Sequence, residues 1–502
     1  MLTRFIGTTS SIIFMFLFSG QGIQGQSHPS GVLQRVLIAV QNPTGMQGGS
    51  PVLAPQFSLQ IANAATDSFP TSAPPTISGY GLHIPASLEN LTGQGYGVVQ
   101  NEDGSALMLN YGSEAVSGSN IGSASPVNGS VLTENLRYMI TASELGGAIT
   151  VQDLQSSNPP VKLNLAGASS ASVIPGSSVA LVFAADANVV YYLRHLSATH
   201  EQGYANGQWP PNAVDCEPYS LPTFCLMQLA PAGANVATFS QTYFDHPIKA
   251  VISSTGESLF VLNGGAEADG VKGSVTVVPA GPVALEDGTQ SGTIPNSLTQ
   301  YQLAFPAGTV YGVDNAIAAG TKLYVAGQAR VSPGVWKGQL SVIDVTTGTA
   351  SNPMNIADGI PVRMTLADDN TLWIGSIRCN TGENAQAGTP FGCLTVVNLT
   401  SASVGLIEDW YCVIDSSTKC SGDHPDSYRY QGGGSGDVTG IAPITGLHKV
   451  YYVEHGQVHI RQTISPYSIV PNNGVTVAGV AVDVTYMDAG TDNDGTATST
   501  QR

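Results

Sequence analysis

Short apolar runs separated by polar turns return along the chain in a fixed order. From Pro247, "PIKAVISSTGESLFVLNGG" holds one apolar run, a turn and a second run, and "GSVTVV" follows after an insertion. The order repeats from Pro361 in "PVRMTLADDNTLWIGSIRC" and "GCLTVVNLT". Runs that are apolar on both faces, without alternation, are typical of strands buried on both sides. The pattern predicts a repeated unit of three to four strands.

Further copies extend this repeat over most of the chain. Two are clear, "NAIAAGTKLYVAGQ" with "GQLSVIDVTTG" and "GIAPITGLHKVYYVEHGQVHIRQ", and weaker ones lie upstream. The spacing between copies varies from about thirty to nearly eighty residues, so insertions vary while strands persist. The predicted centre strands lie near Leu107, Tyr138, Tyr191, Phe260, Tyr324, Trp373 and Tyr451. The fold class is therefore predicted as all-β, a β-propeller of about seven blades with long loop inserts, and six or eight blades stay possible.

The clearest copies share a more specific sequence pattern. "LFVLNGG" with "GSVTVV", "KLYVAGQ" with "GQLSVIDVTTGT", and "VYYVEHGQVHI" resemble the repeats of the YVTN family of bacterial extracytoplasmic β-propellers. The resemblance covers about residues 56–484 and implies seven blades. Such rings usually close by combining strands from both chain ends, so we expect residues 35–40 or 56–62 to meet residues 475–487.

The chain ends differ in composition from the repeats. Arg4 and the apolar run 12–18, followed by small residues, predict a signal peptide at 1–22, and no cysteine follows as a lipoprotein would need. The expected organisation is a segment at 23–55 that contributes a ring-closing strand, a propeller at 56–487 and a disordered tail at 488–502. The predicted location is periplasmic or extracellular, without membrane insertion after signal cleavage.

Charge narrows the range of partners. Lys and Arg number 17 against 35 Asp and Glu, for a formal net charge of -18. This charge opposes phosphate backbones, so nucleic acid is not expected as a partner. A protein or carbohydrate partner remains open, and we expect a monomer.

The chain has six cysteines, in local pairs. An even number in an exported chain predicts disulfides, and the absence of a Cys-x-x-Cys motif argues against zinc. Sequence proximity favours three bridges, although six cysteines allow fifteen connectivities. The expected pairs are Cys216 with Cys225, Cys379 with Cys393, and Cys412 with Cys420.

One candidate ligand site lies at the mouth of the expected central channel. Asp245 and His246 precede Pro247, and Lys249 lies as far beyond that proline as Arg363 lies beyond Pro361. Equal register in a ring means equal height, so the two cations would form an anion-attracting patch. The alternative is that each cation pairs locally with a carboxylate of a neighbouring blade.

Aromatic residues on two inserts form a second candidate site. Trp209 and Tyr219 lie in one insert, and Trp410, Tyr411, Tyr428 and Tyr430 lie in another. Rigid rings on disulfide-tied loops suit sugar stacking or protein recognition. The alternative is that they form small satellite cores over the blades.

Searches for a P-loop, a His-Glu-x-x-His motif or a haem-attachment motif find none, so no catalytic residue, metal or cofactor is assigned. We therefore expect an exported binding or scaffolding propeller that acts through variable loops on one face. The alternatives are an enzyme of the lactonase or lyase type at the channel, by fold analogy, and a subunit of an envelope assembly with a large apolar patch.

Overall fold

The computed structural model describes residues 28–489 of the 502-residue chain, with internal gaps. The gaps are 42–45, 48–49, 52–56, 92–94, 104, 118–128, 133–137, 144–147, 154–159, 166–179, 185–188, 197–212, 215–222, 231–234, 241–246, 256–257, 264–272, 280–298, 308, 333–334, 378, 380–391, 410–437, 455, 471–474 and 478. Most strands between residues 129 and 248 are described through backbone pairing alone. In the described part of the chain all named elements are β-strands. Among these residues, none forms a helix with the length and apolar character needed to cross a membrane.

The strands form nine sheets in the described residues, and eight of these contain three or more strands. The first four of the eight, in chain order, are β5 (Pro85–Leu91), β6 (Tyr96–Asn101), β7 (Ala106–Asn110) and β8 (Ala115–Ser117); β9 (Gly129–Leu132), β10 (Tyr138–Ser143), β11 (Ala148–Asp153) and β12 (Val161–Leu165), with β15 (Ala213–Val214) beside β12; β13 (Ala180–Ala184), β14 (Val189–Leu196), β16 (Thr223–Ala230) and β17 (Asn235–Ser240); and β18 (Pro247–Ile252), β19 (Ser258–Asn263), β20 (Ser274–Pro279) and β21 (Thr299–Gln302).

The other four sheets follow in the same way. They are β22 (Asn315–Ala319), β23 (Lys322–Ser332), β24 (Val335–Asp344) and β25 (Thr349–Ala350), with β26 (Met354–Asn355) beside β24; β27 (Ile360–Ala367), β28 (Thr371–Ile377), β29 (Cys393–Asn398) and β30 (Ser403–Asp409); β31 (Val438–Ile444), β32 (Lys449–Glu454) and β33 (Gln457–Gln462); and β34 (Val480–Tyr486), β1 (Arg35–Gln41) and β4 (Ser58–Asn63). The remaining sheet is the hairpin β2 (Met46–Gln47) and β3 (Ser50–Pro51).

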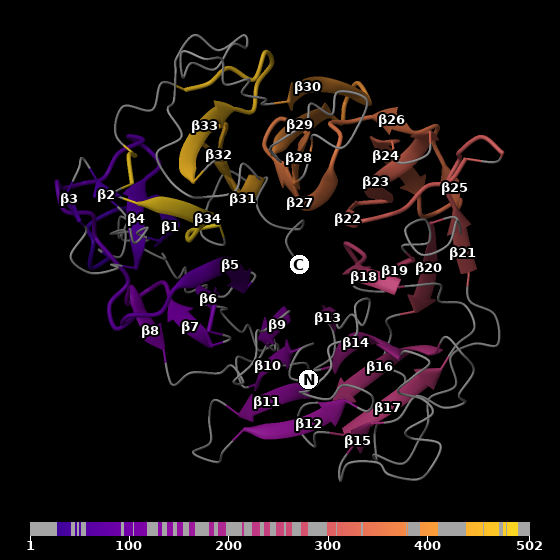
Figure 1. Cartoon of the computed structure of the whole chain (residues 1–502), viewed down its shortest axis with the longest axis horizontal. Coiled ribbons are helices and arrows are strands. Elements are labelled where there is room, and N and C mark those ends of the chain that lie inside the picture. The colour runs from indigo at the N-terminus through magenta and orange to yellow at the C-terminus, as the bar shows by residue number, and fades with distance from the viewer. Residues whose placement is uncertain are drawn as a thin grey trace, which may run out of the picture.

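The sheets stand around a common centre, with the first strand of each sheet innermost (Figure 1). The innermost strands contact one another in the order β9, β13, β18, β22, β27, β31, β34 and β5. Radial antiparallel sheets in this arrangement are typical of a β-propeller, which confirms the all-β propeller part of the predicted fold class. The seven expected centre strands, at Leu107, Tyr138, Tyr191, Phe260, Tyr324, Trp373 and Tyr451, lie in seven different sheets. The terminal sheet β34–β1–β4 is a further one.

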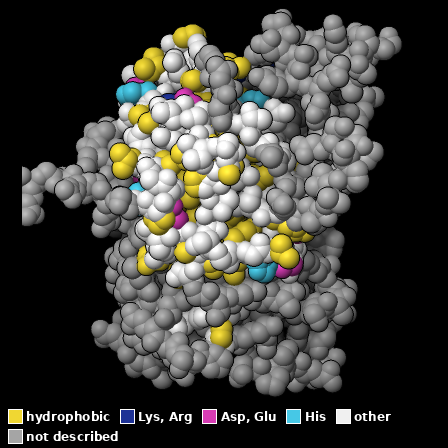
Figure 2. All heavy atoms as spheres, turned by 90° about the vertical axis from the view of Figure 1, so that its left-hand side faces the viewer, with side chains coloured by type: hydrophobic (Ala, Val, Ile, Leu, Met, Phe, Trp, Pro, Cys, Tyr) yellow, Lys and Arg dark blue, Asp and Glu magenta, His cyan; other side chains and the backbone are white. Residues whose placement is uncertain are grey.

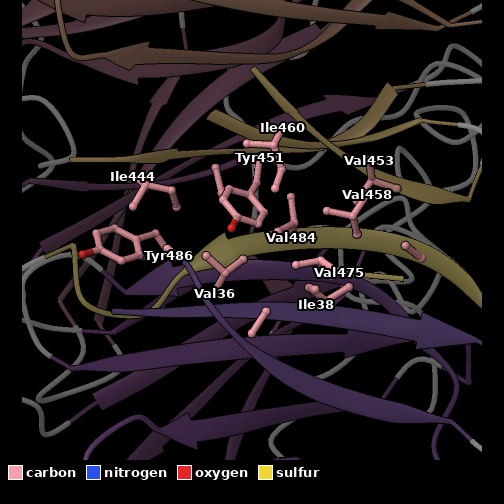
Figure 3. Packing of buried hydrophobic residues seen from close by; sticks show 14 of the residues in the cluster. Val36, Ile38, Ile444, Tyr451, Val453, Val458, Ile460, Val475, Val484 and Tyr486 are labelled. Atoms are coloured by element: carbon pink, nitrogen blue, oxygen red, sulfur yellow. The ribbon is translucent and has the colours of Figure 1, made fainter. Parts of the chain in front are cut away.

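The terminal sheet joins the two ends of the described chain. Strand β1 pairs antiparallel with β34 on one side and with β4 on the other, so both regions expected to meet the C-terminal strand belong to this sheet. β1 lies inside the segment 23–55 and is a strand of the ring. One face of β1 packs against the β31–β33 sheet, where Val36 and Ile38, with Val484 of the neighbouring β34, share a cluster with Tyr451 of β32 (Figure 3).

Buried charges reinforce this closure. The Arg35 side chain donates to Asp488 at 2.5 Å through Nη2, to Glu114 at 3.0 Å and to the Tyr111 carbonyl at 2.5 Å through Nη1. All three charged side chains are almost fully buried. Asp488 was expected to begin a disordered tail. That boundary is placed too early, because the carboxylate of Asp488 is the main partner of Arg35.

The strands bury both faces, as their apolar runs predict. β28 and β32 are buried over nearly their whole lengths, including Trp373 and Tyr452. Adjacent sheets share these side chains, so one hydrophobic cluster joins β28 and β29 to β32. Burial of apolar surface between sheets therefore supplies most of the contact that holds neighbouring blades together.

Candidate functional site

A β-bulge recurs near the start of several innermost strands and determines where along these strands the candidate site lies. The pairing register shifts within the first two or three pairs in four sheets, between Pro247 and Lys249, Pro361 and Arg363, Val438 and Gly440, and Pro85 and Ser87. A bulge of this kind redirects the side chain that follows it. Lys249 and Arg363 consequently occupy the same register in β18 and β27. Together with Asn315, Gly440 and Asp483 they form what we term the inner tier.

Lys249 reaches from β18 to the next innermost strand. Its Nζ donates a hydrogen bond of 2.6 Å to Asn315 Oδ1 at the start of β22. Burial, and after it the positive charge of Arg363, lower the pKa of Lys249 from its ordinary value to about 8, while Glu89 opposes the shift. The ammonium thus loses hydration without gaining a carboxylate hydrogen-bond partner among the described residues.

Arg363 reaches further, across one whole sheet. Its Nε donates 2.9 Å to the carbonyl of Thr439 on β31, and its Nη2 lies 2.8 Å from Asp483 Oδ2 on β34. Gly440 makes this crossing possible. A Cβ there would collide with Asp483 Oδ1 and lie only 2.7 Å from the backbone nitrogen of Val484.

Asp483 connects the inner tier to the next sheet. Its Oδ2 accepts the backbone N–H of Leu88 on β5 at 2.8 Å, and its Oδ1 accepts that of Val484. Burial raises the pKa of Asp483, against the opposing effects of Arg363 and these two hydrogen bonds. Sequence reasoning missed this residue, although one carboxylate inside the apolar run "VAVDVTY" was a usable signal because buried acids need partners.

The predicted residues therefore separate into two groups. The structure brings Lys249 and Arg363 into one tier, whereas Asp245 and His246 lie outside the described residues. Arg363 does pair with a carboxylate, but Asp483 belongs to the second sheet along and not to the adjacent one. Lys249 pairs with an amide. The arrangement can bind negative charge, since Lys249 uses one donor and Arg363 uses Nε and Nη2 within the described part.

The other candidates lie largely beyond the described residues. The loop aromatics Trp209, Tyr219, Trp410, Tyr411, Tyr428 and Tyr430 all fall in gaps. So do Cys216, Cys412 and Cys420, while Cys225 is described only as a backbone position of β16. In the described part of the chain, no cluster of three or more His, Cys, Asp or Glu side chains is arranged to hold a metal ion.

One predicted disulfide is confirmed. Cys379 lies just beyond β28 and Cys393 begins β29, with their Cα atoms 6.0 Å apart and a sequence separation of 14. Both side chains are buried with Ala357. The bridge joins the two strand ends that flank residues 380–391, so it fixes the base of that insert.

Strand direction places the inserts relative to the inner tier. The tier lies in the first half of β18, β22, β27 and β31 and at the middle of β34, so the first four strands begin at one common face. In an antiparallel sheet of four strands, the second strand also ends at that face, the third begins there and the fourth ends there. The strand ends flanking residues 197–222, 380–391 and 410–437 therefore open on the face nearest the tier.

Comparison with known proteins shows only distant likeness. No protein-family profile matches the chain, and no curated protein matches it. Among solved structures, apo AztD from Citrobacter koseri is similar at 9% identity and a TM-score of 0.48 over 90% of this chain and 97% of that one. Saccharomyces cerevisiae Sqt1 is similar at 8% identity and 0.46, covering 78% of this chain and 85% of that one. Hydrazine synthase from Kuenenia stuttgartiensis gives 11% and 0.41, covering 64% and 80%. The fold assignment accordingly rests on the sheet topology of the chain itself.

Proposed function

We propose that this protein is an exported β-propeller of eight blades that works as a binding or scaffolding module through one face. The terminal sheet β34–β1–β4 supplies the eighth blade beside the seven repeats. The supporting observation is topological. The described strand ends that flank both inserts open on the same face as the inner tier.

The repeat sequences support a place in the YVTN family. The three segments that carry the resemblance map onto β19 with β20, β23 with β24, and β32 with β33, the same positions in three blades. Equal motifs at equal structural positions are expected of a true repeat. Family membership is therefore part of the proposal.

The described surface suits a protein or carbohydrate partner better than a nucleic acid. Figure 2 shows one side of the molecule, where the charged side chains of the described residues are few and scattered among hydrophobic side chains, other side chains and backbone. The formal net charge of -18 disfavours a polyanion. Stacking of aromatic residues on sugar rings, or their insertion at a protein interface, needs no such charge.

Export can be tested on the protein from its own cells. Mass spectrometry of the unreduced chain should find an N-terminus near residue 23 and an intact bridge between Cys379 and Cys393. The same spectra test the pairs Cys216 with Cys225 and Cys412 with Cys420. An uncleaved N-terminus, or a free thiol at Cys379, would contradict the proposal that the chain is exported and oxidised.

Binding can be tested with the insert tryptophans. The fluorescently labelled chain is applied to a glycan array, and Trp209→Ala and Trp410→Ala are compared with Trp336→Ala, which lies on β24 outside the inserts. Loss of signal of about tenfold or more in the insert variants alone supports a sugar-binding face.

The rival enzyme function predicts instead that the chain hydrolyses members of a lactone panel and that Arg363→Gln abolishes turnover.

A further inference from the structure

The inner tier holds two cations whose hydrogen-bonding capacity is only partly used. Lys249 Nζ has three N–H groups and makes its one described hydrogen bond to Asn315. Arg363 commits Nε and Nη2, and Nη1 has no partner in the described part of the chain. The Arg363 side chain is 38% exposed, so solvent and small solutes reach it.

Both cations hold their positions through contacts that an anion would leave intact. Asn315 fixes Lys249, while Thr439 and Asp483 fix Arg363 through Nε and Nη2. Preorganised donors cost little side-chain entropy when a ligand binds. A guanidinium edge and an ammonium acting together suit the oxygen atoms of a carboxylate or a phosphate.

We propose that Lys249, Asn315 and Arg363 form a binding site for a small oxyanion, a carboxylate or a phosphate, at the centre of the ring. This site deepens the proposed binding function, since it would recognise the charged group of a ligand or partner held on the same face. Arg363 Nη1 and the two spare Lys249 N–H groups donate to the anion oxygens, and Asn315 keeps Lys249 in position.

The surrounding charges limit the size of the ligand. Glu89 on β5 acts on Lys249 from across the ring, and Asp483 on β34 already holds Arg363. These carboxylates nearly balance the two cations, so a large polyanion meets repulsion while a small anion gains local hydrogen bonds. The acid groups thereby select for size and low charge.

Anion binding is coupled to the protonation of Lys249. Burial and the Arg363 charge lower the pKa of Lys249 to about 8 in the free chain. A bound anion stabilises the ammonium and raises that pKa. Binding at about pH 8.5 therefore takes up protons and weakens further as the pH rises, whereas binding at about pH 6.5 takes up almost none.

The test uses isothermal titration of the signal-cleaved, disulfide-intact chain with sodium succinate and with inorganic phosphate. Titrations at about pH 6.5 and 8.5, in two buffers of different ionisation enthalpy, report proton uptake. We expect binding of at least one of the two anions, proton uptake only at the higher pH, and affinity at least about tenfold weaker in Lys249→Gln. Lys337→Gln, on β24, is the matched control and should bind as the unaltered chain does.

A second readout needs no variant. Acylation of amines by acetic anhydride at about pH 8, followed by peptide mass mapping, should modify Lys249 readily and should slow there in the presence of the binding anion. Absence of heat with both anions together with unchanged Lys249 acylation overturns the site. Equal weakening in Lys337→Gln also overturns it, because it would show diffuse surface attraction. Glycan or protein binding through the inserts would survive either result, so the proposed function is tested separately.

Discussion

Two arginines anchor strand β34, and their surroundings differ. Arg35 lies beside its C-terminal end, where all three guanidinium nitrogens are used by Asp488, Glu114 and a carbonyl, with each charged side chain no more than 5% exposed. Arg363 meets the middle of β34 through Asp483, and its side chain is 38% exposed. The first arginine closes the ring, and the second combines a link between blades with spare donors at the centre.

The difference shows how one type of ion pair serves two purposes. A buried pair whose donors are all used tolerates no change of partner, because removal of one member leaves uncompensated charge in a medium of low dielectric constant. An ion pair that solvent reaches tolerates the loss of one partner better, because water or a ligand can replace the lost hydrogen bond. Variants at the two sites should therefore differ in both stability and binding.

Removal of the buried arginine should have the largest effect. Arg35→Met leaves the buried carboxylates of Asp488 and Glu114 without their cationic partner, and we expect the free energy of unfolding to fall by about 3–5 kcal/mol at pH 7. Arg363→Met should cost less, about 2 kcal/mol, because Asp483 retains two backbone donors and can take up a proton. Urea unfolding followed by tryptophan fluorescence measures both changes, with the exposed Arg330→Met as control. A larger loss at Arg363 would reverse the assignment of the closing contact.

A methyl group at Gly440 should break the central link without removing a charge. Gly440→Ala places Cβ against Asp483 and within 2.7 Å of the Val484 nitrogen, so β31 and β34 must separate. We expect a loss of about 1–3 kcal/mol by thermal unfolding, together with weaker anion binding. Gly112→Ala is the control, since its nearest neighbour is a side-chain oxygen of Asn110 at 3.3 Å. Equal losses in the two variants would show that close approach at Gly440 does not matter.

Much of the fold follows from local sequence, but the two anchors do not. Repeated apolar runs such as "LFVLN" and "LWIGS" predict the blades, because strands buried on both faces lack alternation. Arg35 and Asp488 are separated by 453 positions, and no repeat or spacing rule relates them. The repeats predict about seven blades, and the terminal sheet β34–β1–β4, which is built from both chain ends, has no continuous repeat to count.

The candidate site was predictable in its register and not in its partners. The prolines at 247 and 361 align Lys249 with Arg363, and the bulges after them preserve that alignment in three dimensions. Which groups they meet depends on neighbouring blades. Asp483 was missed because only the ring geometry and the small size of Gly440 let Arg363 reach across a whole sheet.

The buried Lys249 should make the free energy of unfolding depend on pH. With its pKa lowered to about 8, Lys249 binds fewer protons in the folded than in the unfolded chain between about pH 8 and 10.5. The charged Lys249 therefore lowers the free energy of unfolding below about pH 8. This destabilisation decreases as the pH rises from about 8 to 10.5. Lys249→Met should stabilise the chain by about 1–2 kcal/mol at pH 7 and lose this advantage near pH 10. Urea titrations across this range, with Lys337→Met as control, measure the effect. A Lys249→Met chain that is less stable at pH 7 would place Lys249 among the contacts that stabilise the ring.

The smallest change is expected at the opposite face, where the hairpin turns of adjacent blades meet in solvent. His448 Nδ1 lies 3.0 Å from Asp369 Oδ2 and its ring is 54% exposed, while the Gly446 and His448 backbone nitrogens donate independently to Asp368. His448 has a φ of 51°, which asparagine tolerates well. His448→Asn removes the ring contact and keeps the backbone bonds, so we expect a loss below about 1 kcal/mol and no change in anion binding. Thermal unfolding at pH 6 and 8 measures it. A loss above about 2 kcal/mol would mean that exposed contacts between turns hold the blades as strongly as buried charges do, and the contrast between the two arginines would then not follow from burial.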